Sequence, residues 1–280
     1  MEEYYFLFFL AFVWMIFAAI CDFKTREIPN WGNFSLIAVA LAYRAFYSIS
    51  KNETMFFVYG LIGTLFFIGF GFLFYYGRAF AGGDAKLLMA LGAVLPFESY
   101  TDYFFIGLGF IFILFMVGAL YSLIYSTFLI RGKKGFAKTF EKKIGNKKLL
   151  VYGFLIAGIF AGIWFFYSAD VFFGFYLFIL GLMPLFYFYA KTVDEMCMIK
   201  LTQPGDLREG DWIVRDIKTG KGVIKNRVDG LSKNEIQLLK KIGKKVLIRD
   251  GLPFAISFLM AFMVFVFLFL RYGFSFLPVF

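Results

Sequence analysis

Two aspartates are the residues of this sequence best placed to do chemistry. Asp22 ends a long apolar run, in AAICDFKTREIPNW, and Asp84 precedes a short one, in AFAGGDAKLLMALGAVLP. A carboxylate at the depth of a membrane helix is a functional candidate, because burying its charge is costly. Two carboxylates brought close share one proton, so one acts as a base on water while the other donates to a carbonyl oxygen. Such a pair can hydrolyse a peptide bond without a covalent intermediate.

Other hydrolytic chemistries are excluded by composition. The chain has no histidine among its 280 residues, which removes Ser-His-Asp and Cys-His catalysis, H-E-x-x-H zinc proteases and histidine-ligated metals. Its two cysteines, Cys21 and Cys197, are too few for a disulfide framework or a four-cysteine zinc site. We therefore expect hydrolysis on carboxylates, lysine or hydroxyl groups, with no metal and no cofactor.

The residues next to Asp84 each have a functional and a structural interpretation. Gly82 and Gly83 permit the backbone angles of a turn between helices, and they also let a second backbone, such as an extended substrate, approach. Asp84 is either half of the catalytic pair or a helix N-cap. Lys86 either lowers the pKa of Asp84 or extends its amine to lipid headgroups. Asp22 can likewise be an ordinary residue at a helix end.

The elements that must position these residues are membrane helices. Hydrophobic residues make up 61% of the chain, and apolar runs of about 18 residues or more are typical of membrane spans. The fourth run would be roughly 17 Å long as a helix, about half a hydrocarbon core, so protein must shield it. We predict an all-α polytopic membrane protein of six to eight transmembrane helices, one of them short. The eight apolar segments are 4–20, 34–49, 55–76, 85–95, 103–130, 149–167, 171–190 and 253–270.

Two further expectations concern these apolar runs. The first segment follows Met-Glu-Glu and precedes no small-residue cleavage site, so we expect a retained helix and not a signal peptide. The phenylalanine-rich runs, with 44 Phe in all, are expected to face lipid.

The net charge of +10 would suggest a nucleic-acid partner in a soluble protein. Here 26 of the 29 lysines and arginines fall on one side if the N-terminus is outside and all eight segments cross. Arg44, Lys51 and Arg271 are the exceptions. This bias follows the positive-inside rule, and it predicts a multi-pass protein of the cell membrane with Asp22 and Asp84 at the cytoplasmic face. The polybasic loop 131–148 is expected to touch anionic headgroups, with no nucleic-acid partner. The oligomeric state is not predicted.

Residues 191–252 break the membrane pattern. They are rich in Gly, Asp and Lys around short β-branched pieces, which is typical of turns and short strands. Ser232 and Glu235 then have the spacing of a capping box before an amphipathic helix with Ile236, Leu238, Leu239 and Ile242 on its apolar face. We predict a transmembrane catalytic domain over 1–190, a small cytoplasmic α+β module over 191–252, and a last membrane helix with a tail over 253–280.

The two aspartate segments resemble a known family. AGGDAKLLMALGA is similar to the Gly-x-Gly-Asp region of the aspartyl membrane proteases, above all the prepilin and preflagellin peptidases, whose motif continues Asp-x-Lys-Leu. The segment after Asp22 resembles the Asp…Ile-Pro-Asn segment of that family. The usual first glycine is Ala81 here, and the four-cysteine zinc domain of bacterial members is absent. The matching positions of the first segment are Asp22, Lys24, Arg26, Ile28, Pro29 and Asn30.

The resemblance implies an archaeal-type peptidase that removes the short basic leader from type IV pilin-like precursors at the cytoplasmic face. Asp22 and Asp84 would be its catalytic pair, and we place Glu27 as a site that attracts a basic residue of the leader. N-methylation, which bacterial relatives also perform, is not implied. Two rival functions are a presenilin-like intramembrane protease and a transporter that uses the carboxylates as a proton relay. A third is a purely structural membrane subunit.

Overall fold

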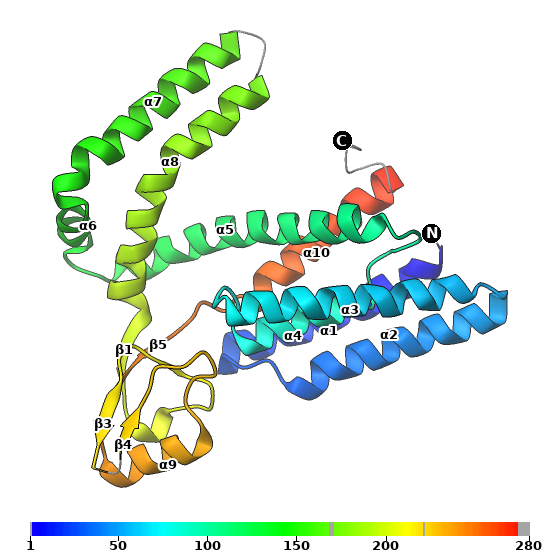
Figure 1. The fold of residues 1–280 in the computed structure, drawn as a ribbon, viewed down its shortest axis with the longest axis horizontal. Helices are drawn as coiled ribbons and strands as arrows, with labels where there is room; N and C mark the ends of the chain where they lie inside the picture. Colours follow the sequence, from blue (N-terminus) through cyan, green and yellow to red (C-terminus); the bar gives the residue numbers. More distant parts are fainter. Residues whose placement is uncertain (1, 168–170, 221, 274–280) are drawn as a thin grey trace. The chain divides into compact units, whose positions relative to one another are not determined.

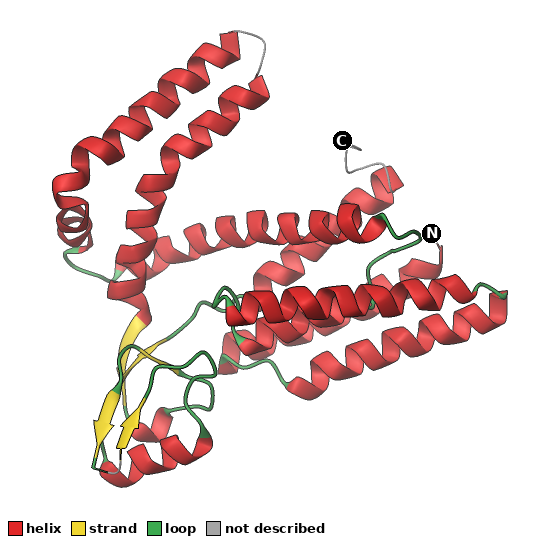
Figure 2. Ribbon diagram, viewed as in Figure 1, coloured by secondary structure: helices red, strands yellow, loops and turns green. Residues whose placement is uncertain are grey.

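The computed structural model describes residues 2–167, 171–220 and 222–273. Most of these residues are helical, and the strands are confined to one small region late in the chain (Figure 2). The chain forms two compact units. The first consists of Met1–Leu123, Arg227–Gly230 and Gly251–Phe280, and the second of Ile124–Asn226 and Leu231–Asp250.

The first unit is a bundle of membrane-type helices. Helices distant in sequence are neighbours within it, since α10 packs along α1, and the short α4 contacts both α2 and α3 (Figure 1). Its helices are α1 (Glu2–Thr25), α2 (Asn30–Lys51), α3 (Thr54–Tyr76), α4 (Gly82–Leu91), the π-helical turn η1 (Tyr103–Gly107), α5 (Leu108–Arg131), whose last turns belong to the second unit, and α10 (Ala255–Tyr272).

Six helices among the described residues are long and apolar enough to cross a membrane. This confirms the prediction of a polytopic helical membrane protein. Helix α2 is less apolar and is not one of the six, and α4 is too short. The six candidate spans are Glu2–Thr25, Thr54–Tyr76, Tyr103–Arg131, Phe136–Phe165, Leu177–Met198 and Ala255–Tyr272.

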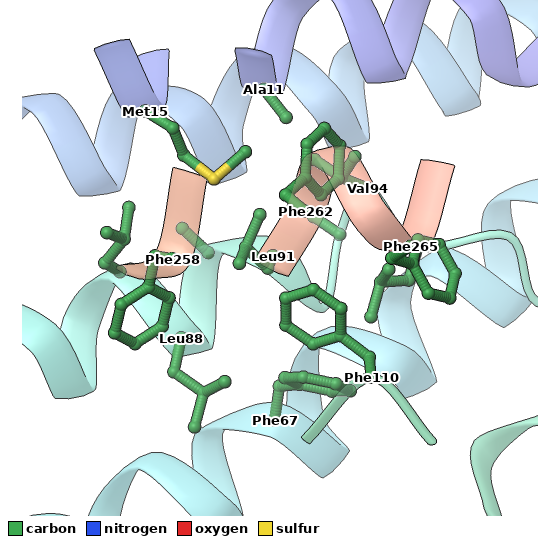
Figure 3. Packing of buried hydrophobic residues seen from close by; sticks show 14 of the residues in the cluster. Ala11, Met15, Phe67, Leu88, Leu91, Val94, Phe110, Phe258, Phe262 and Phe265 are labelled. Atoms are coloured by element: carbon green, nitrogen blue, oxygen red, sulfur yellow. The ribbon is translucent and has the colours of Figure 1, made fainter. Parts of the chain in front are cut away.

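The short helix α4 lies in the core of the first unit, as its length requires. Its apolar side chains Leu88 and Leu91 point among aromatic rings of α3, α5 and α10 (Figure 3). Seven phenylalanines of this core are at most 1% exposed, so the expectation that the phenylalanines face lipid was wrong for them. Lipid is as apolar as phenylalanine, and close van der Waals packing between helices is what holds such rings inside. They are Phe67, Phe97, Phe110, Phe258, Phe262, Phe265 and Phe269.

A buried arginine holds the chain where α4 ends. The Arg44 side chain is 0% exposed. Its Nε donates to the carbonyl of Ala93 at 2.8 Å, its Nη1 to Phe56 at 2.9 Å and its Nη2 to Leu95 at 2.7 Å. A helix leaves its last carbonyls without intrahelical partners, and the guanidinium supplies donors for carbonyls just beyond α4. Gly60 leaves the space, because a Cβ there would fall on the Arg44 side chain.

The second unit combines a helical hairpin with the predicted α+β module. Helix α7 packs tightly on α8, and a Cβ on Gly158 would lie 2.8 Å from the Cα of Gly181. Strands β1, β5 and β2 form an antiparallel sheet in that order, and β3 pairs with β4. Its elements are α6 (Phe136–Ile144), η2 (Gly145–Lys147), α7 (Lys148–Tyr167), α8 (Val171–Val193), η3 (Asp194–Met198), β1 (Ile199–Thr202), η4 (Pro204–Asp206), β2 (Trp212–Ile213), β3 (Ile217–Thr219), β4 (Gly222–Ile224), α9 (Lys233–Ile242) and β5 (Val246–Arg249).

The capping box predicted for α9 is present. The Ser232 hydroxyl accepts from the Glu235 amide, and the Glu235 carboxylate accepts from the Ser232 amide. Ile236 and Leu239 are buried against the sheet as predicted, whereas Ile242 is 47% exposed, which corrects the predicted apolar face. The helix ends at Ile242, so that residue lies at the edge of the small core.

Candidate active site

Asp22 lies in the last turn of α1 and is only 7% exposed. Its Oδ2 accepts a hydrogen bond of 2.9 Å from the backbone N–H of Ala255, the first residue of α10. Its own carbonyl accepts from the amide of Arg26 at 2.9 Å, and Arg26 has a positive φ of 57°. Helix α1 is therefore followed at once by a left-handed residue, four positions after the aspartate, and this turn fixes the helix end that carries Asp22.

Asp84 is the third residue of α4 and is partly buried. The N-cap is Ala81, in an extended conformation, so the N-cap interpretation of Asp84 was wrong. Gly82 and Gly83 are helical and neither has a positive φ, which corrects the expectation that they make the turn. The left-handed residue between α3 and α4 is Arg78, with a φ of 57°.

The structure brings the two carboxylates close enough to interact electrostatically, although 62 positions separate them in sequence. Asp84 lies outside the six candidate spans. Burial, and then the like charge of Asp22, raise the pKa of the Asp84 carboxyl to about 8, because both disfavour its ionised form. At neutral pH the Asp84 carboxyl is therefore protonated, and it lies beside a second carboxylate.

The first turn of α2 fixes the first turn of α4. Asn30 accepts a hydrogen bond of 2.7 Å from the Lys86 amine, so neither interpretation of Lys86 describes its contact here. The Asn33 side chain, 1% exposed, donates to the Gly83 carbonyl at 3.5 Å. Gly83 also packs on Ile28, since a Cβ on this glycine would meet the Ile28 Cβ at 3.2 Å. The close approach predicted for a glycine is therefore present at Gly83, toward a neighbouring segment of the chain.

Asn33 was missed by sequence reasoning. The available signal is its spacing, because Asn30 and Asn33 lie three residues apart and so on one face of α2. Pro29 is the N-cap of α2, and its rigid backbone starts the helix at Asn30. Glu27 is exposed in the connection between α1 and α2, without an ion pair among the described residues. The geometry brings together Asp22, Asp84, Gly83, Lys86 and Asn30, and leaves Glu27 at the surface.

Fold and site together define a polytopic helical membrane protein with paired carboxylates at one end of a bundle. The profile of the type IV leader peptidase family matches residues 9–126, a stretch that contains both aspartates. The resemblance stated from the two motifs is thereby confirmed for this part of the chain.

Two curated relatives agree with that match. The chain is 33% identical over 91 residues to a preflagellin peptidase of Methanocaldococcus jannaschii, which covers 32% of this chain and 38% of the relative. It is 31% identical over 103 residues to the prepilin peptidase EppA of Methanothermobacter thermautotrophicus, which covers 36% of this chain and 27% of the relative. The matches thus span less than two fifths of the length of either relative. No solved structure matches the chain significantly.

Proposed function

We propose that this protein is a membrane aspartyl endopeptidase that removes the short basic leader from type IV pilin-like precursors, such as archaeal prepilins or preflagellins. The observation that carries the proposal is the meeting of Asp22 and Asp84 within the stretch similar to leader peptidases. Both relatives are named for the substrate class, one as a preflagellin peptidase and the other as a prepilin peptidase. The presenilin-like and transporter alternatives are not favoured by these comparisons.

The chemistry follows from the two carboxylates. One carboxylate takes a proton from water, whose oxygen attacks the scissile carbonyl carbon, while the protonated carboxyl donates to the carbonyl oxygen. The resulting tetrahedral diol collapses when a proton passes to the amide nitrogen and the C–N bond breaks. All protons come from water and the pair itself, so the reaction requires no metal or cofactor.

The membrane supplies the setting of this reaction. A pilin-like precursor carries a basic leader followed by a hydrophobic helix. The helix can lie in the bilayer while the peptide bond between leader and helix stays at the depth of Asp22 and Asp84. We place the pair at the cytoplasmic face, with the N-terminus outside, on the bias of basic residues. Basic residues of the loop 131–148 would contact anionic headgroups; Lys133, Lys134, Lys138 and Lys142 are exposed there.

The proposal is tested by co-expression of each variant with a pilin-type precursor and detection of the leader on a gel. Asp22→Asn and Asp84→Asn should each lower cleavage at least roughly 100-fold, because each removes one proton-transfer group. Asp102→Asn is the matched control, since Asp102 accepts two backbone amides in a turn before α5 and takes no part in the pair. Full leader removal by either site variant, with folded protein present, would refute the proposal.

Glu27 is proposed as a contact for the basic leader. The side chain is exposed beside the segment that precedes α2, where a cationic leader can reach it. Glu27→Gln should slow the processing of basic leaders several-fold through the loss of one exposed charge pair, worth up to about 1 kcal/mol. A neutral-leader precursor is the control substrate, and an equal loss on both substrates would reject the role of Glu27.

A further inference from the structure

The N-terminus of α10 reaches the catalytic pair from outside the stretch that resembles leader peptidases. Ala255, the first residue of α10, is 0% exposed, and its N–H donates to Asp22 Oδ2 at 2.9 Å. The first amides of a helix have no intrahelical acceptor. For the Ala255 amide the acceptor is the Asp22 carboxylate, which lies 233 residues earlier in the sequence.

This amide is held in place on both sides. Behind it, α10 packs along α1, where the rings of Phe8 and Phe262 meet edge to face at 6.0 Å. Ahead of it, Arg26 Nη1 donates to the carbonyl of Gly251 at 3.1 Å. The same arginine makes the left-handed turn that ends α1. Asp22 and the Ala255 amide are therefore fixed against each other by the bundle.

The surroundings of the two carboxylates differ in charge. Asp22 accepts the Ala255 amide at the positive end of the α10 dipole, and a helix N-terminus favours a negative charge beside it. Asp84 interacts electrostatically with the Asp22 carboxylate, and its backbone partner is Ala81, the N-cap of its own helix. An ionised Asp22 beside Asp84 makes the second ionisation costly. The single proton of the pair then resides on Asp84.

We propose that the N-terminus of α10 is a positioning element of the catalytic centre, whose Ala255 amide orients the Asp22 carboxylate and keeps it ionised. This rests on the function proposed above. Asp22 is then the base that takes the proton of water, and Asp84 is the acid that donates its proton to the scissile carbonyl oxygen. Helix α10 begins at residue 255, beyond the family match at 9–126, so that match assigns it no role.

The test removes one N–H without changing a side chain. Residue 255 is incorporated as lactic acid, the α-hydroxy analogue of alanine, by suppression of a stop codon in cell-free synthesis of the full chain. The control is the same amide-to-ester change at residue 257. The Ser257 amide donates to the Phe254 carbonyl at 2.9 Å, so the control loses a bond of equal length in the same turn but none to Asp22.

Leader cleavage is measured against pH for both ester variants. The change at 255 should lower kcat about tenfold, leave KM unchanged, and move the acidic limb of the profile upward by about one pH unit, because Asp22 then holds a proton more tightly. The change at 257 should leave the profile unmoved. Identical profiles for the two variants would overturn the proposal.

A second readout does not depend on cleavage. A hydrophobic carbodiimide modifies protonated carboxyl groups, and mass spectrometry locates the adduct. At neutral pH the unmodified protein and the 257 variant should carry it on Asp84, and the 255 variant should divide it between Asp84 and Asp22. Equal labelling patterns in all three would overturn the role of α10. A protein that labels as expected but cleaves no pilin-like precursor would refute the proposed function alone.

Discussion

At the scale of single residues, the two aspartates of the pair stand in different surroundings. Asp22 accepts the amide of Ala255, while Asp84 is partly buried at the start of α4 beside the charge of Asp22. Two chemically identical side chains can divide the roles of base and acid when their environments differ in this way.

The pH dependence of cleavage is a prediction at this scale. With a pKa of about 8, Asp84 is protonated below that pH and able to donate, and it loses its proton as the pH rises through that value. Cleavage should therefore fall on the alkaline side of this pKa, measured as kcat/KM against pH with purified protein. Thermal melting over the same range controls for unfolding. A rate that stays level well above the pKa would contradict the assignment of Asp84 as the acid.

At the scale of elements, α4 is held at both ends by side chains of α2. Asn30 and Asn33 contact its first turn, and Arg44 binds the carbonyls just beyond its last. Because a helix is stiff, a change at the Arg44 end should also move Asp84, about 15 Å away along ten residues.

Replacement of this arginine should therefore cost both stability and activity. Arg44→Met leaves buried carbonyls without donors, which should lower the free energy of unfolding by about 3–5 kcal/mol. Melting in detergent measures the loss, and Lys51→Met, an exposed cation of the same helix, is the control with an effect under about 0.5 kcal/mol.

Gly60→Ala offers an independent check of that result. It keeps the arginine but places a Cβ on its side chain, so it should destabilise in the same direction. If Arg44→Met and Gly60→Ala both melt at the wild-type temperature, Arg44 does not hold α4.

At the scale of the whole molecule, the first unit supports a crossing by the segment that contains α4. Asp84 lies beside Asp22 near the end of α1, whereas the Phe97 carbonyl accepts from the Tyr4 hydroxyl at 3.2 Å near its beginning. The segment between these residues thus runs the length of the bundle. A re-entrant segment would instead return to the face where it entered, and would reverse the positions of the later loops.

The orientation itself is tested with cysteine labelling. In a Cys21→Ser, Cys197→Ser background, a membrane-impermeant thiol reagent applied outside the cell should modify Lys51→Cys and leave Lys142→Cys unlabelled. Both lysines are exposed in the structure, so accessibility to the reagent should depend on the side of the membrane. Permeabilised cells are the control, in which both should react. Labelling of Lys142→Cys in intact cells would reverse the proposed orientation.

The local chemistry of the sequence was sufficient to predict the membrane helices, the helix cap and the aspartate motifs. Long apolar runs predict membrane helices because no other open structure satisfies its backbone in lipid, and the Ser232–Glu235 spacing predicts a cap that depends on four residues alone. The absence of histidine and the two aspartate motifs narrowed the chemistry to a carboxylate pair.

Only the tertiary structure decided which distant groups meet. Arg44 looked like an ordinary cation of the outer side, yet it is buried on carbonyls some fifty residues away. The seven core phenylalanines are chemically identical to those that face lipid, so composition cannot separate them. The hydrogen bond between Asp22 and the Ala255 amide likewise cannot be predicted from local sequence, because a backbone amide does not distinguish one residue type from another. Such contacts depend on how helices pack, which is a property of the whole bundle.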